Sequence, residues 1–255
     1  IKTMWIDSHC HMDSVLLSQN SEKVFSACVA EGVDSIIIPS VAKENFDKVI
    51  KIAAKYKQCV YALGFHPMYL NGFDDGDLEL LEYYLLNNNS VAVGEIGLDL
   101  FVKKNNQSLQ EDIFLSQLKI AKKFDLPVIM HVRGAIDLVL KNLRKIKVRG
   151  GIAHAFNGSF QQADQLIELG FKLGFGGAMT YPGSKHIQAL AKELPIEAIV
   201  LETDSPDMPP AWLGNGENNQ PKELGRIAEF FCHLRSLEPS KTADIIRVNT
   251  IEAIP

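Results

Sequence analysis

The sequence predicts a closed (β/α)8 barrel, the TIM-barrel fold, as a single domain over residues 1–255. Three observations indicate it. Eight short apolar segments recur along the 255 residues, amphipathic stretches separate them, and a histidine or carboxylate follows most of them. Each apolar segment with its connection takes about 32 residues, the size of one βα unit. Apolar strands that alternate with helices are typical of a parallel sheet covered on both faces, and an open doubly wound sheet is the alternative.

The first expected strand ends in His9 and His11, which are separated by one residue. Successive side chains of a strand alternate between its faces, so both imidazoles are expected on one face, with Cys10 on the other. Five later strands are followed by His66, Glu95, His131, His154 and Asp204. The expected strands are residues 5–11, 34–38, 60–65, 91–94, 126–130, 150–153, 171–175 and 198–203.

The stretches between the strands have the periodicity of amphipathic helices. Residues 224–234 place Leu, Ile, Ala, Phe and Leu at the 3.6-residue spacing of one buried face. Residues 115–121 and 187–194 repeat this spacing. Asp77 and Ser184 are candidate N-caps for two of the helices.

Composition is typical of a globular protein, with 46% hydrophobic and 22% charged residues. No apolar run approaches the roughly 20 residues that span a bilayer, so we expect no transmembrane helix and no membrane partner. No signal sequence is recognisable, and the four cysteines show no paired spacing, which indicates reduced thiols. We therefore expect a cytoplasmic protein, and a monomer.

The net charge of −5 argues against broad, sequence-independent binding of duplex nucleic acid, which needs a basic face. A nucleic-acid substrate held at one point is still compatible with this charge, because divalent metal ions can supply the local positive field. Lys103, Lys104 and Arg133 follow expected strands and are candidates for the mouth of such a site.

The residues that follow the strands form a candidate metal site, because the carboxyl ends of all barrel strands meet at one face. Six nitrogen or oxygen ligands fit two divalent ions, such as zinc, magnesium or manganese, better than one. Glu95 is the candidate bridge, since its strand lies between those that carry the histidine pairs. Two bridged ions can share a hydroxide and activate it as a nucleophile. The six candidate ligands are His9, His11, Glu95, His131, His154 and Asp204.

The order of these motifs resembles that of the TatD-like metal-dependent deoxyribonucleases of the amidohydrolase superfamily. The resemblance runs from residue 6 to about 207 and is carried by residues 9–11, 64–67, 94–99, 127–133, 154–156 and 202–206. It implies a TIM barrel with a binuclear site that hydrolyses phosphodiesters of DNA, often as an exonuclease. It also implies individual roles: one ion on His9, His11 and Asp204, the other on His131 and His154, Glu95 between them, and His66 and Arg133 near the substrate phosphate.

Three functions are open from the sequence. The first is a binuclear phosphodiesterase acting on DNA, with Asp204 as the general base and the bridging hydroxide as nucleophile. The second is an amidohydrolase that cleaves an amide, lactone or ester in a small metabolite. Many such enzymes carry a carboxylated lysine on the fourth strand, where this chain has Glu95, which favours the first. The third, a non-catalytic metal-binding or scaffold protein, is disfavoured by the complete ligand set. Glu202 is expected to orient a ligand histidine.

Overall fold

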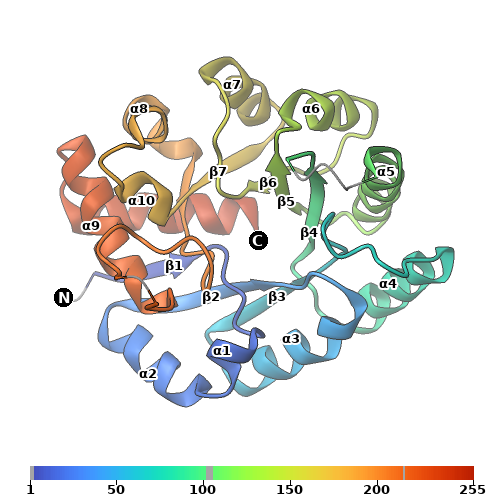
Figure 1. Cartoon of the computed structure of the whole chain (residues 1–255), viewed down its shortest axis with the longest axis horizontal. Helices are drawn as coiled ribbons and strands as arrows, with labels where there is room; N and C mark the ends of the chain where they lie inside the picture. The colour runs from blue at the N-terminus through green and yellow to red at the C-terminus, as the bar shows by residue number, and fades with distance from the viewer. Residues whose placement is uncertain (1–2, 102–105, 215) are drawn as a thin grey trace.

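The computed structural model describes residues 3–101, 106–214 and 216–255. In these residues eight strands form one parallel sheet in chain order, each paired with the next. Helices surround the sheet, so the predicted barrel of alternating strands and helices is confirmed (Figure 1). The strands are β1 (Trp5–Asp7), β2 (Val33–Pro39), β3 (Cys59–Leu63), β4 (Ala92–Asp99), β5 (Val128–Arg133), β6 (Gly151–Ala153), β7 (Phe171–Phe175) and β8 (Ile199–Leu201).

The helices bury the apolar faces that the periodicity predicts. In α9, for example, Leu224, Ile227 and Phe231 are fully buried against the sheet. None of the helices in the described part of the chain combines the length and apolar character needed to cross a membrane. The α-helices are α1 (Val15–Ser18), α2 (Ser21–Ala30), α3 (Lys43–Lys55), α4 (Asp75–Asn87), α5 (Gln107–Lys123), α6 (Ile136–Lys145), α7 (Phe160–Glu168), α8 (Lys185–Glu193), α9 (Leu224–Arg235) and α10 (Pro239–Ala253), and the 3-10 helices are η1 (Gly177–Thr180), η2 (Ile196–Ala198) and η3 (Pro221–Glu223).

Hydrogen bonds that join the segment after β1 to β8 and to the segment after β8 bring the two ends of the sheet together. The Ser8 N–H and hydroxyl both donate to the Leu201 carbonyl, at 3.1 and 3.0 Å. The Asp204 N–H donates to the His9 carbonyl at 2.9 Å. These bonds place the segment after β8 directly beside the segment after β1, which is where the sequence puts three candidate metal ligands.

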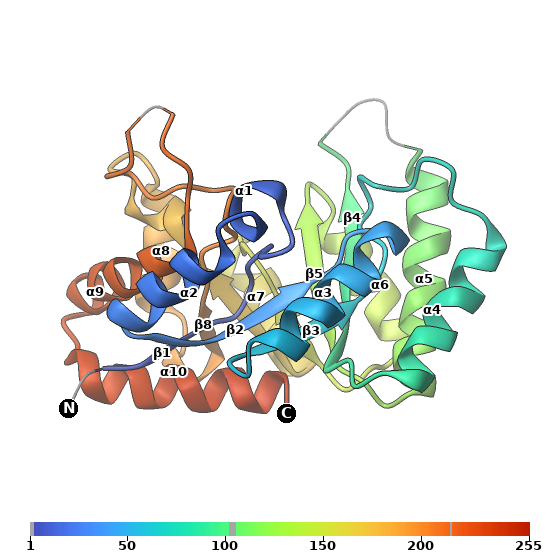
Figure 2. The ribbon, with the colours of Figure 1, turned by 90° about the horizontal axis from the view of Figure 1, so that it is seen from below.

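The opposite end of the barrel interior is closed by the C-terminal helix. α10 runs across that end, beneath the strands (Figure 2). Ala253 and Ile254 pack there against buried side chains of β2 to β6 and β8: Ile37, Ala62, Ala92, Ile129, Ile152 and Val200. Side chains therefore fill the barrel at this end, and the polar candidates lie at the other.

Several boundaries differ from those expected. β1 ends at Asp7, so His9 and His11 lie in the segment that follows it, whereas Glu95 and His131 lie inside β4 and β5. The expectation that Asp77 is an N-cap is wrong. The N-cap of α4 is Asp74, whose side chain accepts the Gly76 N–H at 2.8 Å, while Asp77 accepts the Asp74 N–H from the third helical position. An aspartate at either position satisfies a free N–H, so sequence alone favoured neither.

Candidate metal centre and active site

Glu95 is the centre of the polar cluster at the carboxyl end of the strands. It lies within β4 and is almost completely buried. One carboxylate oxygen, Oε1, lies 2.8 Å from His154 Nε2, 3.2 Å from His131 Nδ1 and 3.3 Å from His66 Nε2. Three histidines from three different strand ends thus converge on one oxygen atom.

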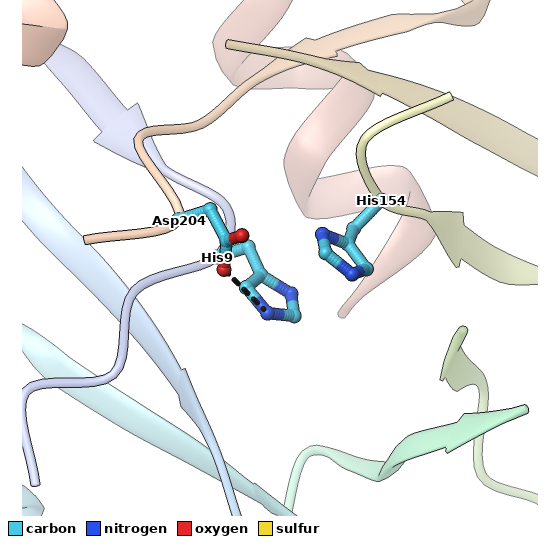
Figure 3. Close-up of side chains that lie close together, drawn as sticks. All are labelled: His9, His154 and Asp204. Carbon is cyan, nitrogen blue, oxygen red and sulfur yellow. Dashed lines mark ion pairs between the residues drawn. The ribbon is translucent and has the colours of Figure 1, made fainter. Parts of the chain in front are cut away.

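The other oxygen of Glu95 faces a second group. Its Oε2 lies 3.2 Å from His9 Nε2 and 3.5 Å from His11 Nε2. Asp204 Oδ1 lies 3.5 Å from each of the same two nitrogens. The His9 ring also stacks on that of His154, with centroids 3.9 Å apart, which joins the two groups (Figure 3). All six candidate ligands are therefore in one cluster, with Glu95 between the two sets of histidines.

The partners of the distal ring nitrogens indicate which histidines offer a lone pair to the cluster. His131 Nε2 lies 2.9 Å from Asp99 Oδ2, so this nitrogen carries the proton and Nδ1 faces the cluster as an acceptor. His154 Nδ1 lies 3.6 Å from Glu202 Oε1, on the side away from Glu95. The hydrogen bond to Asp99 therefore favours the His131 tautomer that binds a metal, whereas His154 Nδ1 has no hydrogen-bond partner among the described residues and lies only near the charge of Glu202.

His66 is arranged in the opposite way. Its Nδ1 accepts the N–H of Met68 at 3.1 Å, so in the neutral ring the proton is on Nε2. Nε2 therefore donates, toward Glu95 or toward a bound substrate, instead of offering a lone pair. The spacing of the atoms alone would group His66 with Glu95 and His131 as metal-capable, but the tautomer separates it from the ligand histidines.

The cluster fits divalent metal ions by its chemistry as well as its spacing. Among the described residues, the buried Glu95 Oε2 has no hydrogen-bond partner. His9 Nε2 and His11 Nε2 face each other at 3.3 Å, as do His131 Nδ1 and His154 Nε2. Converging nitrogen lone pairs and carboxylate oxygens are the ligands that borderline divalent ions prefer.

Two carboxylates, Asp99 and Glu202, lie behind the ligand histidines, and the sequence only partly indicates these positions. Asp99 lies four residues after Glu95 on the same strand, a spacing that returns side chains to one face. Glu202, expected to orient a ligand histidine, accepts the Ala155 N–H at 2.6 Å behind His154. A Cβ on Gly174 would overlap this carboxylate, so glycine in β7 makes room for it.

Arg133 ends β5 outside the cluster. Its guanidinium carbon lies 3.9 Å from the centroid of the exposed Phe101 ring, an arrangement that orients the cation without neutralising it. The side chain is exposed and borders a cavity of about 610 Å³ that His131 and His154 also line. Lys103 and Lys104 lie outside the described residues.

Comparison with known proteins identifies the family. The sequence model of the family described as TatD related DNase matches residues 6–254. This chain belongs to the TatD family. An uncharacterized metal-dependent hydrolase of Escherichia coli K12, YjjV, is 38% identical over 249 residues and 96% of each chain. A metal-dependent hydrolase of Haemophilus influenzae is 35% identical, covering 93% of this chain and 94% of its own.

Solved structures of TatD proteins have the same fold. The crystal structure of E. coli YjjV, described as a TatD homologue, superposes with a TM-score of 0.94 at 37% identity over 98% of this chain and 97% of its own. A TatD-family hydrolase of Entamoeba histolytica superposes with a TM-score of 0.87 at 20% identity, covering 100% and 99% of the two chains, which shows the shared fold alone. The chain is thus a TatD-family metal-dependent hydrolase with a cluster of candidate metal-binding residues.

We expect the affinity of this TatD-family site for divalent metal to rise with pH up to about 9. In the metal-free protein burial lowers the pKa of His11, but its hydrogen bond to Asp204 and the charge of Glu95 outweigh burial and raise the pKa to about 9. His11 is then an imidazolium at neutral pH and must lose a proton before it binds a metal. Because the folded-state pKa of His11 is above the unfolded value of 6.5, its protonation stabilises the metal-free folded protein. This stabilisation is complete below pH 6.5 and is lost as the pH rises toward 9.

The measurement is a zinc titration against a chromophoric chelator at several pH values, corrected for protonation of the chelator. Calorimetry in two buffers of different ionisation enthalpy should also detect proton release on binding. A corrected affinity that stays constant between pH 7 and pH 9 would contradict the protonated state assigned to His11.

Proposed function

We propose that the protein is a binuclear metal-dependent phosphodiesterase that hydrolyses DNA from a strand end. The observation that carries the proposal is that the two oxygens of Glu95 face two different sets of histidines. His9, His11 and Asp204 would hold one divalent ion, His131 and His154 the other, and Glu95 would contact both. The description of the matching family as TatD related DNase supports DNA as the substrate.

Divalent ions of zinc, magnesium or manganese would lower the pKa of a water molecule there and neutralise charge on the phosphate. Asp204 accepts the proton of the water that attacks phosphorus. Burial raises the pKa of Asp204, but the hydrogen bond to His11 and the charges of His154 and His9 outweigh it and hold the pKa below its usual value. The carboxylate is therefore ionised at neutral pH and able to act as a base.

His66 and Arg133 bind the phosphate from the substrate side. The Nε2–H of His66 points into the cluster and donates to a non-bridging phosphate oxygen. Arg133, held on the Phe101 ring at the edge of the site, adds a positive charge that the chemical step does not need. These two residues position the scissile bond, and Asp204 and Glu95 serve the reaction itself.

An activity screen tests the proposal. Protein loaded with zinc, magnesium or manganese is assayed on phosphodiesters, including single-stranded DNA, and in parallel on amides and lactones. We expect metal-dependent hydrolysis of the phosphodiesters that chelation abolishes reversibly. Turnover of amides or lactones with no phosphodiester hydrolysed would instead establish an amidohydrolase.

Arg133→Ala is expected to raise KM for a phosphodiester by about tenfold, the contribution of a charged hydrogen bond, with kcat changed less than about threefold. The reason is that Arg133 contacts the substrate equally in the ground state and the transition state. Arg149→Ala is the matched control, because Arg149 is also exposed but precedes β6 at the other end of the barrel. Unchanged kinetics of Arg133→Ala on oligonucleotides would place Arg133 outside the site.

A further inference from the structure

Asp7 is a buried carboxylate that the proposed reaction does not use. It is the last residue of β1, two positions before His9, and it is completely buried. Burying a carboxyl group is costly unless hydrogen bonds compensate for the lost water, so the groups that Asp7 binds indicate its role.

The hydrogen bonds of Asp7 join the two segments that carry ligands of one candidate ion. Its Oδ1 accepts the His9 N–H at 3.3 Å and the Thr203 N–H at 2.9 Å. Its Oδ2 accepts the Thr203 hydroxyl at 2.6 Å. His9 is itself a candidate ligand, and Thr203 directly precedes another, Asp204. A single side chain thus links the segment after β1 to the segment after β8.

Thr203 is held at each of its polar groups, so the link reaches Asp204. Besides the bonds to Asp7, Thr203 Oγ1 accepts the Ser205 N–H at 3.2 Å, and the Thr203 carbonyl accepts Asn219 Nδ2 at 2.8 Å. Thr203, Ser205 and Asn219 are all fully buried. The two neighbours of Asp204 are therefore fixed, and these bonds maintain the left-handed backbone of Asp204, which has a φ of 53°.

The barrel does not need this carboxylate in order to close. Backbone hydrogen bonds from Ser8 to Leu201 and from Asp204 to His9 already join the ends of the sheet. Asp7 adds a second connection, made through a side chain, at the residues that lead into the cluster. Its position is therefore better explained by the ligands than by the sheet.

The ligand atoms beside this connection are spaced as a metal ion requires. Ligands about 2.0–2.2 Å from a tetrahedral ion lie about 3.3–3.6 Å from one another. His9 Nε2 lies 3.3 Å from His11 Nε2, and Asp204 Oδ1 lies 3.5 Å from each of them. Glu95 Oε2, the fourth atom of the set, lies 3.2 and 3.5 Å from the same two nitrogens. These atoms are thus spaced for a tetrahedral site.

We propose that Asp7 is a positioning residue for the first metal site, formed by His9, His11 and Asp204. By holding the backbone of His9 and of Thr203 on one carboxylate, it fixes the distance between the His9 imidazole and the Asp204 carboxylate, which lie side by side in Figure 3. Both oxygens of Asp7 are occupied by these bonds, so Asp7 acts through the ligands and is not one itself. The inference rests on the proposed function in taking these atoms as ligands, but it does not depend on which bond is hydrolysed.

Zinc affinity measured in two single-site backgrounds tests this role. His131→Ala keeps the first site and disrupts the second, formed by His131 and His154, whereas His11→Ala does the reverse. Competition of each protein with a chromophoric chelator gives its Kd for zinc. We expect Asp7→Ala to weaken binding by about 10- to 100-fold in the His131→Ala background, as is typical of residues that support a ligand, and by less than about threefold in the His11→Ala background.

Two further variants separate positioning from charge and from general damage. Asp7→Asn should keep most of the affinity, because its amide oxygen can accept both N–H groups and its amide nitrogen can donate to the Thr203 hydroxyl. Asp99→Ala is the matched control, since Asp99 is an equally buried aspartate whose carboxylate binds His131 of the second site. It should give the opposite pattern, with the loss in the His11→Ala background.

Thr203→Val serves if Asp7→Ala fails to fold. It removes the hydroxyl that binds Asp7 Oδ2 but keeps the N–H that binds Oδ1, so a smaller loss is expected in the same background. Any other distribution of the loss between the two backgrounds would overturn the assignment, because a purely structural role acts on both sites alike. A loss in Asp7→Asn as large as in Asp7→Ala would also overturn it, by assigning the effect to charge.

The outcome for Asp7 is independent of the outcome for the reaction. If the wild type hydrolyses no phosphodiester but the loss of zinc affinity is confined to the His131→Ala background, the proposed function fails and the role of Asp7 stands. If phosphodiesters are hydrolysed and the loss is not confined in this way, the reverse holds.

Discussion

Asp204→Asn is expected to lower kcat on a phosphodiester by about 10²- to 10⁴-fold, the range typical of losing general acid–base help. Asparagine has nearly the same shape and can still bind a metal through its carbonyl oxygen, but it cannot accept a proton. We therefore expect the ion at His131 and His154, and most of the ground-state substrate binding, to be kept. KM should change much less than kcat.

The fold should tolerate this substitution. Asp204 has a φ of 53°, in the left-handed region that asparagine and aspartate adopt more readily than other side chains. No cavity forms, so the thermal unfolding midpoint should change little. Asp34→Asn, which breaks a remote ion pair with Arg247, is the control for an Asp-to-Asn change and should keep full activity. Near-normal turnover of Asp204→Asn with both metals bound would mean that another group is the base, and His66 is a poor candidate because its Nδ1 accepts the Met68 N–H and its Nε2 carries a proton.

Glu95→Gln is expected to reduce bound metal to one ion or fewer and to lower kcat/KM by about 10³-fold or more. The estimate follows from the loss of one ion, because a metal ion stabilises the transition state by several kcal/mol. Each 1.4 kcal/mol of lost stabilisation lowers the rate about tenfold. Burial opposes ionisation of Glu95, but the positive charges of His66, His154 and His9 outweigh it and hold its pKa well below the usual value. A neutral amide cannot replace that charge between two ions.

The control for this change is Glu223→Gln. Glu223 is also buried, but its carboxylate accepts the Trp212 Nε1–H at 2.8 Å outside the cluster. The Glu223→Gln variant should keep both ions and full activity. Metal content measured by elemental analysis, together with steady-state rates, compares the two variants. Glu95→Gln protein that retains two ions per chain would show that Glu95 is not the bridge.

Most of the fold was predictable because the barrel pattern is local and repeated. Each strand is a short apolar run, and each helix has its own 3.6-residue stripe. The strand ends were less predictable. Glu95 and His131 lie within strands that continue further, because Gly97, at a φ of 148°, lets β4 approach the backbone of His131 where a Cβ would overlap it. In a sequence a glycine often indicates the end of a strand, but here Gly97 allows β4 to remain paired with β5 as far as Asp99.

The candidate site was predictable in its membership but not in its hydrogen bonding. Residues that follow parallel strands meet at one face, so the six candidate ligands could be named from position alone. Whether a histidine offers a lone pair or a proton depends on what lies behind its ring. For His66 that partner is the nearby Met68 N–H, and for His131 it is Asp99, 32 residues away. The cavity beside His131 and His154 depends on loops from distant parts of the chain, which no local pattern describes.

The most direct test of the central claim is anomalous diffraction from crystals equilibrated with excess zinc or manganese at pH 8. The claim predicts two peaks, one beside His9, His11 and Asp204 and the other beside His131 and His154. Each peak should lie about 2.0–2.2 Å from a different oxygen of Glu95, the usual distance for a carboxylate ligand. A single fully occupied peak at saturating metal, or two peaks of which only one touches Glu95, would contradict the bridged pair of ions.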